Sequence, residues 1–171
     1  MTTAAGPDAI ALLKADHRRV ADLFARFGSA KGNGRERALA KEICLALTVR
    51  TKIEEDVFYP ACKGAVDESL LDEACVEHDA AEVLIAEIEA DAPDAPFYDA
   101  KVTVLSEMME HHVEEEEQRV EGMFSQARKA GLDMEALGEQ VAAEKARLTL
   151  AYKVKGLPQP ETPTLTGTAL A

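Results

Sequence analysis

The residues best suited to chemistry in this chain are three histidines and two glutamates that interrupt apolar stripes at helical spacing. They are His17, Glu54, His78, His112 and Glu116. Burying three imidazoles and two carboxylates in one small core costs several kcal/mol per unpaired charge unless a cation compensates them. Imidazole and carboxylate ligands without thiolate favour iron, with zinc and manganese as further candidates. The pattern therefore predicts a buried metal site.

The same stripes also permit a metal-free interpretation. Arg50 lies one helical turn before Glu54 and on the same stripe. Its guanidinium could pair with Glu54 or Glu116 while the histidines donate hydrogen bonds to the carboxylates. The two interpretations place the same side chains in the interior and differ in what neutralises the carboxylates.

The stretch EHHVEEEE contains more candidate ligands than one helical face can hold. A shift of one residue turns a side chain by about 100° around a helix, so the apolar stripe selects His112 and Glu116. Because these two residues are four apart, they lie one above the other on one face. Among the other charged residues of the stretch, His111, Glu114 and Glu115 are expected in solvent or at the edge of the stripe, and Glu117 is expected in solvent.

Long helices must carry these stripes. Helical periodicity between sparse glycines and prolines predicts helices over about 9–27, 35–61, 67–90 and 97–129, with a fifth over 133–152. Short connections favour antiparallel neighbours. The predicted fold class is all-α: an antiparallel up-and-down four-helix bundle with an extra C-terminal helix and an extended tail.

The length of 171 residues fits one hydrophobic core. We expect one helical bundle domain over residues 1–152, with its core at about 8–130 and its fifth helix at about 133–152. Residues 153–171 contain three prolines and no periodic apolar face, which predicts a tail.

Charge and composition exclude several function classes. There are 19 lysines and arginines against 32 aspartates and glutamates, a formal net charge of −13. Such a surface repels nucleic acid and anionic lipid, so neither is expected as a partner. No apolar run approaches the roughly 18 residues of a membrane-spanning helix. Three cysteines without CxxC spacing fit reduced thiols and predict a cytoplasmic protein.

Four segments, in order and spacing, resemble the motifs of hemerythrin-like HHE cation-binding domains of the bacterial type. The segments are LLKADHRRVADLF, TKIEEDVFYPAC, EHDAAEVLIAEI and EHHVEEEE. The resemblance implies a four-helix bundle holding a non-haem di-iron centre that binds oxygen, nitric oxide or peroxide, or senses iron. It also implies the five residues named above as ligands, with Glu54 and Glu116 as bridging carboxylates.

The sequence departs from the family pattern at three places. Arg50 stands where the family normally has histidine, and arginine cannot act as an ordinary ligand at neutral pH. About three extra residues follow EEEE, where a proline is also lost, and the third helix carries a single histidine. These departures leave three outcomes open: a five-ligand di-iron centre, one metal at the His78 and His112 side, or a metal-free bundle in which Arg50 replaces a cation.

Three functions follow as alternatives. The first is an iron protein that binds or senses a small diatomic gas or peroxide, with two irons or with one if Arg50 weakens the site. The second is an enzyme that decomposes peroxide, for which Tyr59 could donate a proton. The third is a metal-poor structural or interaction module. Whether the protein is an enzyme stays open at this stage, and no protein partner is predicted.

Overall fold

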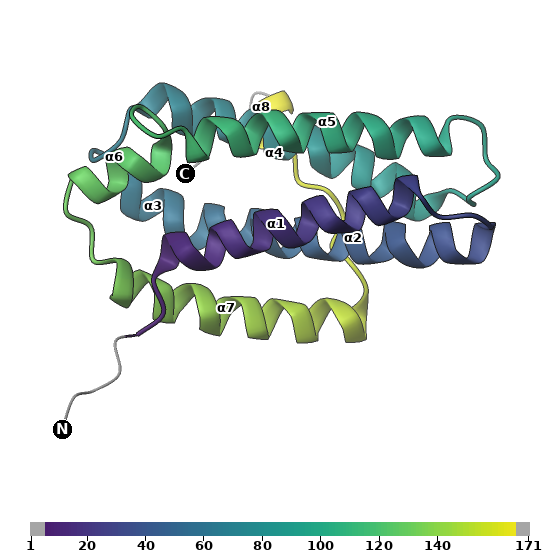
Figure 1. The fold of residues 1–171 in the computed structure, drawn as a ribbon, viewed down its shortest axis with the longest axis horizontal. Helices are drawn as coiled ribbons and strands as arrows, with labels where there is room; N and C mark the ends of the chain where they lie inside the picture. The colour runs from purple at the N-terminus through teal and green to yellow at the C-terminus, as the bar shows by residue number, and fades with distance from the viewer. Residues whose placement is uncertain (1–5, 167–171) are drawn as a thin grey trace.

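Helices form most of the computed structural model, which describes residues 6–166 (Figure 1). Residues 1–5 and 167–171, the ends of the predicted domain and of the predicted tail, lie outside the described residues. No strand occurs between residues 6 and 166. The elements are α1 Ala9–Gly28, α2 Asn33–Ile53, the π-helical turn η1 Glu54–Phe58, α3 Tyr59–Cys62, α4 Glu68–Ala90, α5 Tyr98–Glu117, α6 Met123–Lys129, α7 Met134–Lys155 and α8 Pro163–Thr166.

Aspartate side chains set the start of three helices. Asp8, Asp67 and Asp133 precede α1, α4 and α7, and the carboxylate of each accepts a hydrogen bond from a backbone N–H of the first turn. Such caps satisfy amide groups that the helix itself leaves without partners. The predicted first and third helices begin at these caps.

The prediction of one helix over 97–129 is wrong. The chain leaves the helix after Glu117, turns through residues 118–122, and resumes as α6 at Met123. The break follows four consecutive glutamates, whose charges are unfavourable at the negative C-terminal end of a helix. Gly122 closes the turn, where a Cβ atom would lie 2.4 Å from the carbonyl oxygen of Gln118. Val120, which lies in this turn, is 66% exposed.

The predicted helix over 35–61 is also interrupted, but helical backbone continues on both sides of the interruption. Residues Glu54–Phe58 form a π-helical turn, and the backbone N–H of Tyr59 donates to the carbonyl of Glu54, five residues earlier. Pro60 follows directly; it has no N–H to donate, and in an α-helix its ring would press on the carbonyl of Asp56. The wider turn relieves this conflict at the position of a predicted ligand.

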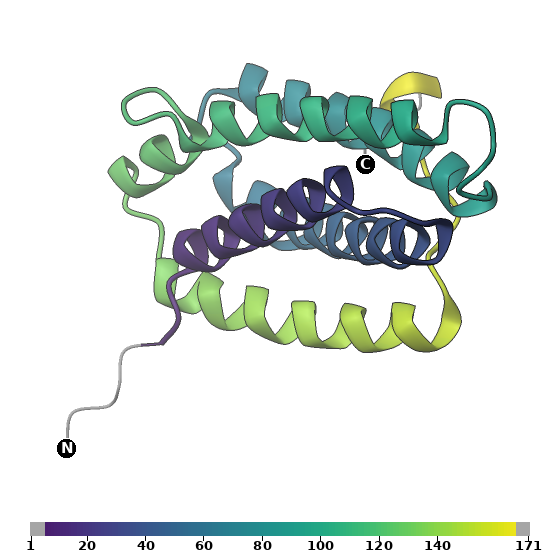
Figure 2. The ribbon, with the colours of Figure 1, turned by 45° about the vertical axis from the view of Figure 1, so that its right-hand side comes forward.

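The helices pack into a bundle around a central polar layer. Helix α1 packs on α2 and α4 packs on α5, while contacts of α1 with α5 and of α2 with α4 join the two pairs. Figure 2 shows α7 along the outer side of α1 and α2. Two apolar clusters fill the interior: one includes Leu13, Phe58 and Phe124, and the other includes Val20 and Leu105. The predicted ligands lie between them.

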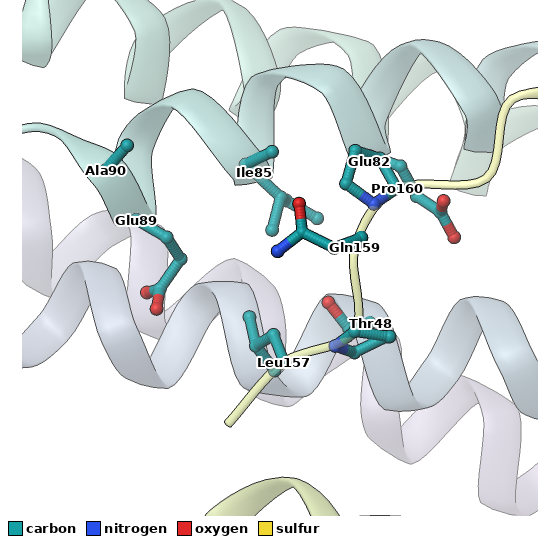
Figure 3. A pocket seen from close by; sticks show the side chains of 10 residues that line it. Thr48, Glu82, Ile85, Glu89, Ala90, Leu157, Gln159 and Pro160 are labelled. Atoms are coloured by element: carbon teal, nitrogen blue, oxygen red, sulfur yellow. The ribbon is translucent and has the colours of Figure 1, made fainter. Parts of the chain in front are cut away.

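After α7 the chain crosses back over the bundle as an arm formed by residues 156–166, which ends in α8. The Thr164 backbone N–H donates to Asp79 Oδ2 at 2.7 Å, and the Glu161 N–H donates to Glu82 Oε2 at 3.0 Å, so the arm is tied to α4. A cavity of about 320 Å³ lies where the arm crosses, between Leu157, Thr48 and the α4 face (Figure 3). No helix within residues 6–166 is long and apolar enough to cross a membrane.

We expect Gly138→Ala to destabilise the fold. A Cβ atom at Gly138 in α7 would lie 1.6 Å from the carbonyl oxygen of Pro7, so backbone must move. The cost of overpacking, about 1–3 kcal/mol, exceeds the gain of about 1 kcal/mol from better helix propensity. Urea denaturation measures the difference. Gly34→Ala, with nothing within 4 Å of the added Cβ, is the control and should be neutral or mildly stabilising. Equal stabilisation by both substitutions would contradict the close approach of Pro7.

Candidate metal centre

All five predicted ligands meet in the polar layer. His17 comes from α1, Glu54 from η1, His78 from α4, and His112 and Glu116 from α5. None is more than 4% exposed. Their convergence follows from the local helical spacing, because each replaces an apolar residue on the stripe that its helix turns inward.

The donor atoms form two adjacent groups that share Glu54. In the first, which we call the His78/His112 site, the Nε2 atoms of the two histidines are 3.3 Å apart. Glu54 Oε2 lies 3.1 Å from His78 Nε2 and 3.9 Å from His112 Nε2. In the second, the His17 site, His17 Nε2 lies 3.7 Å from Glu54 Oε1 and 3.2 Å from Glu116 Oε2.

These separations fit ligands that share a metal ion. Nitrogen and oxygen donors at about 2.0–2.2 Å from one ion lie roughly 3 to 3.5 Å from each other. Several of the same atoms are buried and make no hydrogen bond within residues 6–166: His17 Nε2, both Glu54 oxygens and Glu116 Oε2. Buried polar atoms are rarely left without partners, so this group of donors has the character of an ion site.

Three carboxylates outside this group hold the imidazole rings. His17 Nδ1 donates to Glu117 Oε1 at 2.6 Å, His78 Nδ1 to Glu55 Oε1 at 3.1 Å, and His112 Nδ1 to Glu77 Oε2 at 2.7 Å. A proton on Nδ1 leaves the Nε2 lone pair facing the site, which is the common arrangement behind metal-ligating histidines. The residues present therefore fit a metal centre.

The sequence analysis missed these outer carboxylates. Glu117 was assigned to solvent, yet its half-buried side chain accepts from His17. Each outer carboxylate is the immediate sequence neighbour of a predicted ligand, and the turn of about 100° between neighbours aims it at the histidine of the adjacent helix. A glutamate directly beside a predicted ligand, as in the EE and EH pairs of the sequence, was the signal from which the outer carboxylates could have been predicted.

Arg50 lies beside the His17 site. Its Nε is 3.4 Å from Glu54 Oε1, but neither Nε nor Nη1 has a hydrogen-bond partner among the described residues. Nη2 donates only to the sulfur of Met109 at 3.6 Å. The side chain is 1% exposed. A fixed positive charge therefore lies beside Glu54 Oε1, the oxygen that faces the His17 site.

Tyr59 is the other polar side chain that reaches the ligands. Its hydroxyl donates to Glu116 Oε1 at 2.8 Å and lies 3.5 Å from the Nε2 atoms of both His78 and His112. In a regular α-helix a residue five positions after Glu54 would be turned by about 140° from it. The π-helical turn brings the two residues onto one face, which explains how Tyr59 enters the site.

The close approach of the buried imidazoles and carboxylates determines their protonation states when no metal is bound. Burial alone would lower the pKa of His17, but its contacts with Glu116 and Glu54 outweigh burial and raise it to about 9. Burial would raise the pKa of Glu116, as would the neighbouring Glu54, but His112 and His17 lower it to about 2. Protons on the imidazoles thus substitute for metal charge, and a metal must displace them.

The metal-free protein should lose stability as the pH rises from 6.5 to about 9. The pKa of His17 is raised above its ordinary 6.5, so its stabilising contribution is complete below pH 6.5 and disappears through the folded value. Added metal should reverse the trend, because deprotonated imidazole is the ligand. Melting temperatures across pH 5–10, with chelator and with ferrous ion under anaerobic conditions, measure both. A metal-free melting temperature that rises over this window would contradict the assignment.

A third group of donors lies on the surface. Glu73, His111 and Glu115 approach one another on α4 and α5, but Glu73 and His111 are exposed. Surface carboxylates and imidazoles of this kind are hydrated and gain little from one another. His111 is therefore outside the buried centre, as the stripe analysis predicts.

Comparison with known proteins gives two matches. Residues 8–124 match the family described as Hemerythrin HHE cation binding domain. A crystal structure of a hemerythrin HHE cation binding domain-containing protein from Mycobacterium kansasii is similar, with a TM-score of 0.73 and 24% identity over 87% of this chain and 94% of that chain. At this identity the likeness shows the fold alone. No match was found among curated proteins.

Proposed function

Because the chain belongs to the hemerythrin HHE cation-binding domain family, we propose that it is a non-haem iron protein that binds or senses oxygen, nitric oxide or peroxide. The observation that carries this proposal is the orientation of the three imidazoles. Each donates from Nδ1 to an outer carboxylate and turns Nε2 toward Glu54 or Glu116. We further propose that α1, α2, α4 and α5 form an antiparallel four-helix bundle to which α7 is appended.

In this proposal His17, Glu54, His78, His112 and Glu116 hold the metal, and Glu54 is shared between the two sites. The His78/His112 site fills first, because Arg50 repels a cation at the His17 site. The protein then holds one iron under limiting supply and two when iron is abundant. The ion pair of Arg50 with Glu54 in the metal-free state would depress metal affinity at the His17 site further.

Iron, when bound, supplies an open coordination position that a diatomic gas or peroxide can occupy. The chain provides the surroundings of that position. Phe58 and Phe124 pack edge to face next to His17, at a centroid distance of 5.5 Å, and keep bulk water from this side of the ligands. The outer carboxylates fix the imidazole orientation so that it does not depend on the metal.

A peroxide-decomposing enzyme is the second candidate, and the position of Tyr59 favours it. Burial, together with Glu116 and Glu54, raises the pKa of Tyr59 well above 10, so its hydroxyl keeps its proton at neutral pH. This hydroxyl can donate to a bound ligand. Tyr59→Phe should lower a peroxide turnover rate by about 10²-fold or more if that proton is used. For reversible gas binding the same substitution should mainly accelerate ligand release.

The third candidate, a metal-poor structural bundle, is favoured by Arg50. In that case three imidazolium groups and the guanidinium would neutralise the carboxylates permanently. Added metal would then leave the free energy of unfolding unchanged, whereas a metal ion that binds specifically to the folded state stabilises it by mass action.

The decisive experiment is elemental analysis of untagged protein purified without chelator, with visible spectra in air, with nitric oxide and with peroxide. One to two irons per chain and a spectrum that responds to these ligands are expected. A melting temperature that falls on chelation is the companion result. Less than a tenth of an iron per chain, with stability unmoved by ferrous ion, would overturn the proposal in favour of the metal-poor bundle.

A further inference from the structure

We propose that the groove between α1 and α5 binds a small organic monocarboxylate through Arg50. A cavity of about 320 Å³ opens there, and Arg50 and His17 contribute to its lining. That volume is far above the roughly 10–15 Å³ that a cavity needs to hold one water molecule. Three of the lining residues on α1 and α5 are small and leave room for the groove: Ala21, Ala25 and Ser106.

The guanidinium of Arg50 is the reason to expect an anion. Arg50 is 1% exposed and is one of the residues that line the cavity, and its Nε and Nη1 are buried without hydrogen-bond partners among residues 6–166. Glu54 Oε1, at 3.4 Å from Nε, is an ion-pair neighbour without hydrogen-bond geometry. Buried guanidinium groups are normally paired, and their planar fork matches two oxygens of a carboxylate.

The other residues that line the cavity determine which kind of anion fits it. Val20, Phe24, Met109 and Val113 line the cavity with apolar surface, which suits a short acyl chain. Glu110 is the carboxylate among the lining residues, and it is exposed. A dianion such as inorganic phosphate would meet the repulsion of Glu110 and an apolar wall, so a monocarboxylate with an apolar tail fits better.

This inference goes beyond the proposed function and does not depend on it, because it rests on the cavity and on Nε and Nη1 of Arg50, which have no hydrogen-bond partner among residues 6–166. Metal loading should strengthen carboxylate binding. A cation at the His17 site takes up the charge of Glu54, the nearest carboxylate to the guanidinium, and leaves Arg50 more strongly attractive to an external anion.

Calorimetric titration of the full chain with hexanoate tests the proposal, in metal-free and iron-loaded protein. Saturable binding at one site per chain is expected, at least tenfold tighter than binding of hexanol, because a charge-assisted pair is absent for the alcohol. Arg50→Met should remove that preference. Equal binding of hexanoate and hexanol, or a preference that survives Arg50→Met, would overturn the proposal.

Two further substitutions, each with a matched control, keep the proposal testable if Arg50→Met does not fold. Ala25→Phe fills the groove and should abolish hexanoate binding, whereas Ala15→Phe, exposed on α1 outside the cavity, should not. Glu110→Gln removes the repulsive carboxylate and should tighten hexanoate binding a few-fold. The matched Glu107→Gln, one turn earlier and outside the cavity, should leave it unchanged. Unaltered binding in Ala25→Phe would exclude this groove as the site.

Discussion

Replacing Glu54 by glutamine is expected to lower metal affinity by more than 100-fold and to leave the purified protein nearly free of iron. Glu54 is the one residue shared by both donor groups, and each of its oxygens faces a different group. Changes to residues that only orient a ligand usually cost 10- to 100-fold, so loss of a shared ligand should cost more. Metal per chain by elemental analysis, after dialysis against a stated free iron concentration, measures the effect.

The matched control for Glu54→Gln is Glu55→Gln. Glu55 adjoins Glu54 in the sequence and also pairs with Lys52, but among the predicted ligands it contacts the outer nitrogen of His78, so its replacement should weaken binding by no more than 10- to 100-fold. Circular dichroism shows whether both variants fold. Iron at the wild-type level in folded Glu54→Gln would mean that the buried carboxylates are not ligands.

Arg50→His should raise iron content toward two per chain and strengthen binding at the His17 site by at least tenfold. The substitution acts twice, because it removes a buried positive charge beside Glu54 and adds an imidazole one helical turn before it. Iron titration under anaerobic conditions should resolve two steps in the wild-type protein, the weaker one from the His17 site. In Arg50→His the iron affinities of the two sites should become more similar, so the two steps of the titration should approach each other.

Arg50→Met separates the two contributions. Methionine removes the charge without supplying a nitrogen ligand, so the affinity order at the His17 site should be histidine, then methionine, then arginine. If the metal content of Arg50→His equals that of the wild type, the guanidinium does not limit metal binding, and the asymmetry between the two sites must be abandoned.

The candidate ligands could be predicted because burial and helical spacing both restrict them. A stripe that steps three or four residues distinguishes His112 from His111 and Glu116 from Glu115, and in the structure the selected residue of each pair is more buried. The same reasoning located Arg50 beside Glu54. This reasoning needs only the local geometry of a helix, which follows from the order of the residues in the sequence.

Features that depend on contacts between segments were not predictable in the same way. The break at residues 118–122 leaves the apolar stripe intact on both sides, so periodicity continues across it and predicts one helix. The outer carboxylates look like an ordinary solvated run until the neighbouring helix supplies a histidine. Residues that bind the arm, Asp79 and Glu82, carry no local sign that the chain end returns to them.

The π-helical turn also affects how this chain should be aligned with other proteins. A π-helical turn holds one residue more than the α-helical turn that it replaces. Compared with a protein that has a regular helix here, the chain contains a one-residue insertion between Glu54 and Tyr59. An ungapped alignment through this helix would therefore match either the ligand or the tyrosine to the wrong position. Motifs on the two sides of the turn should be aligned separately before any residue is declared missing from a relative.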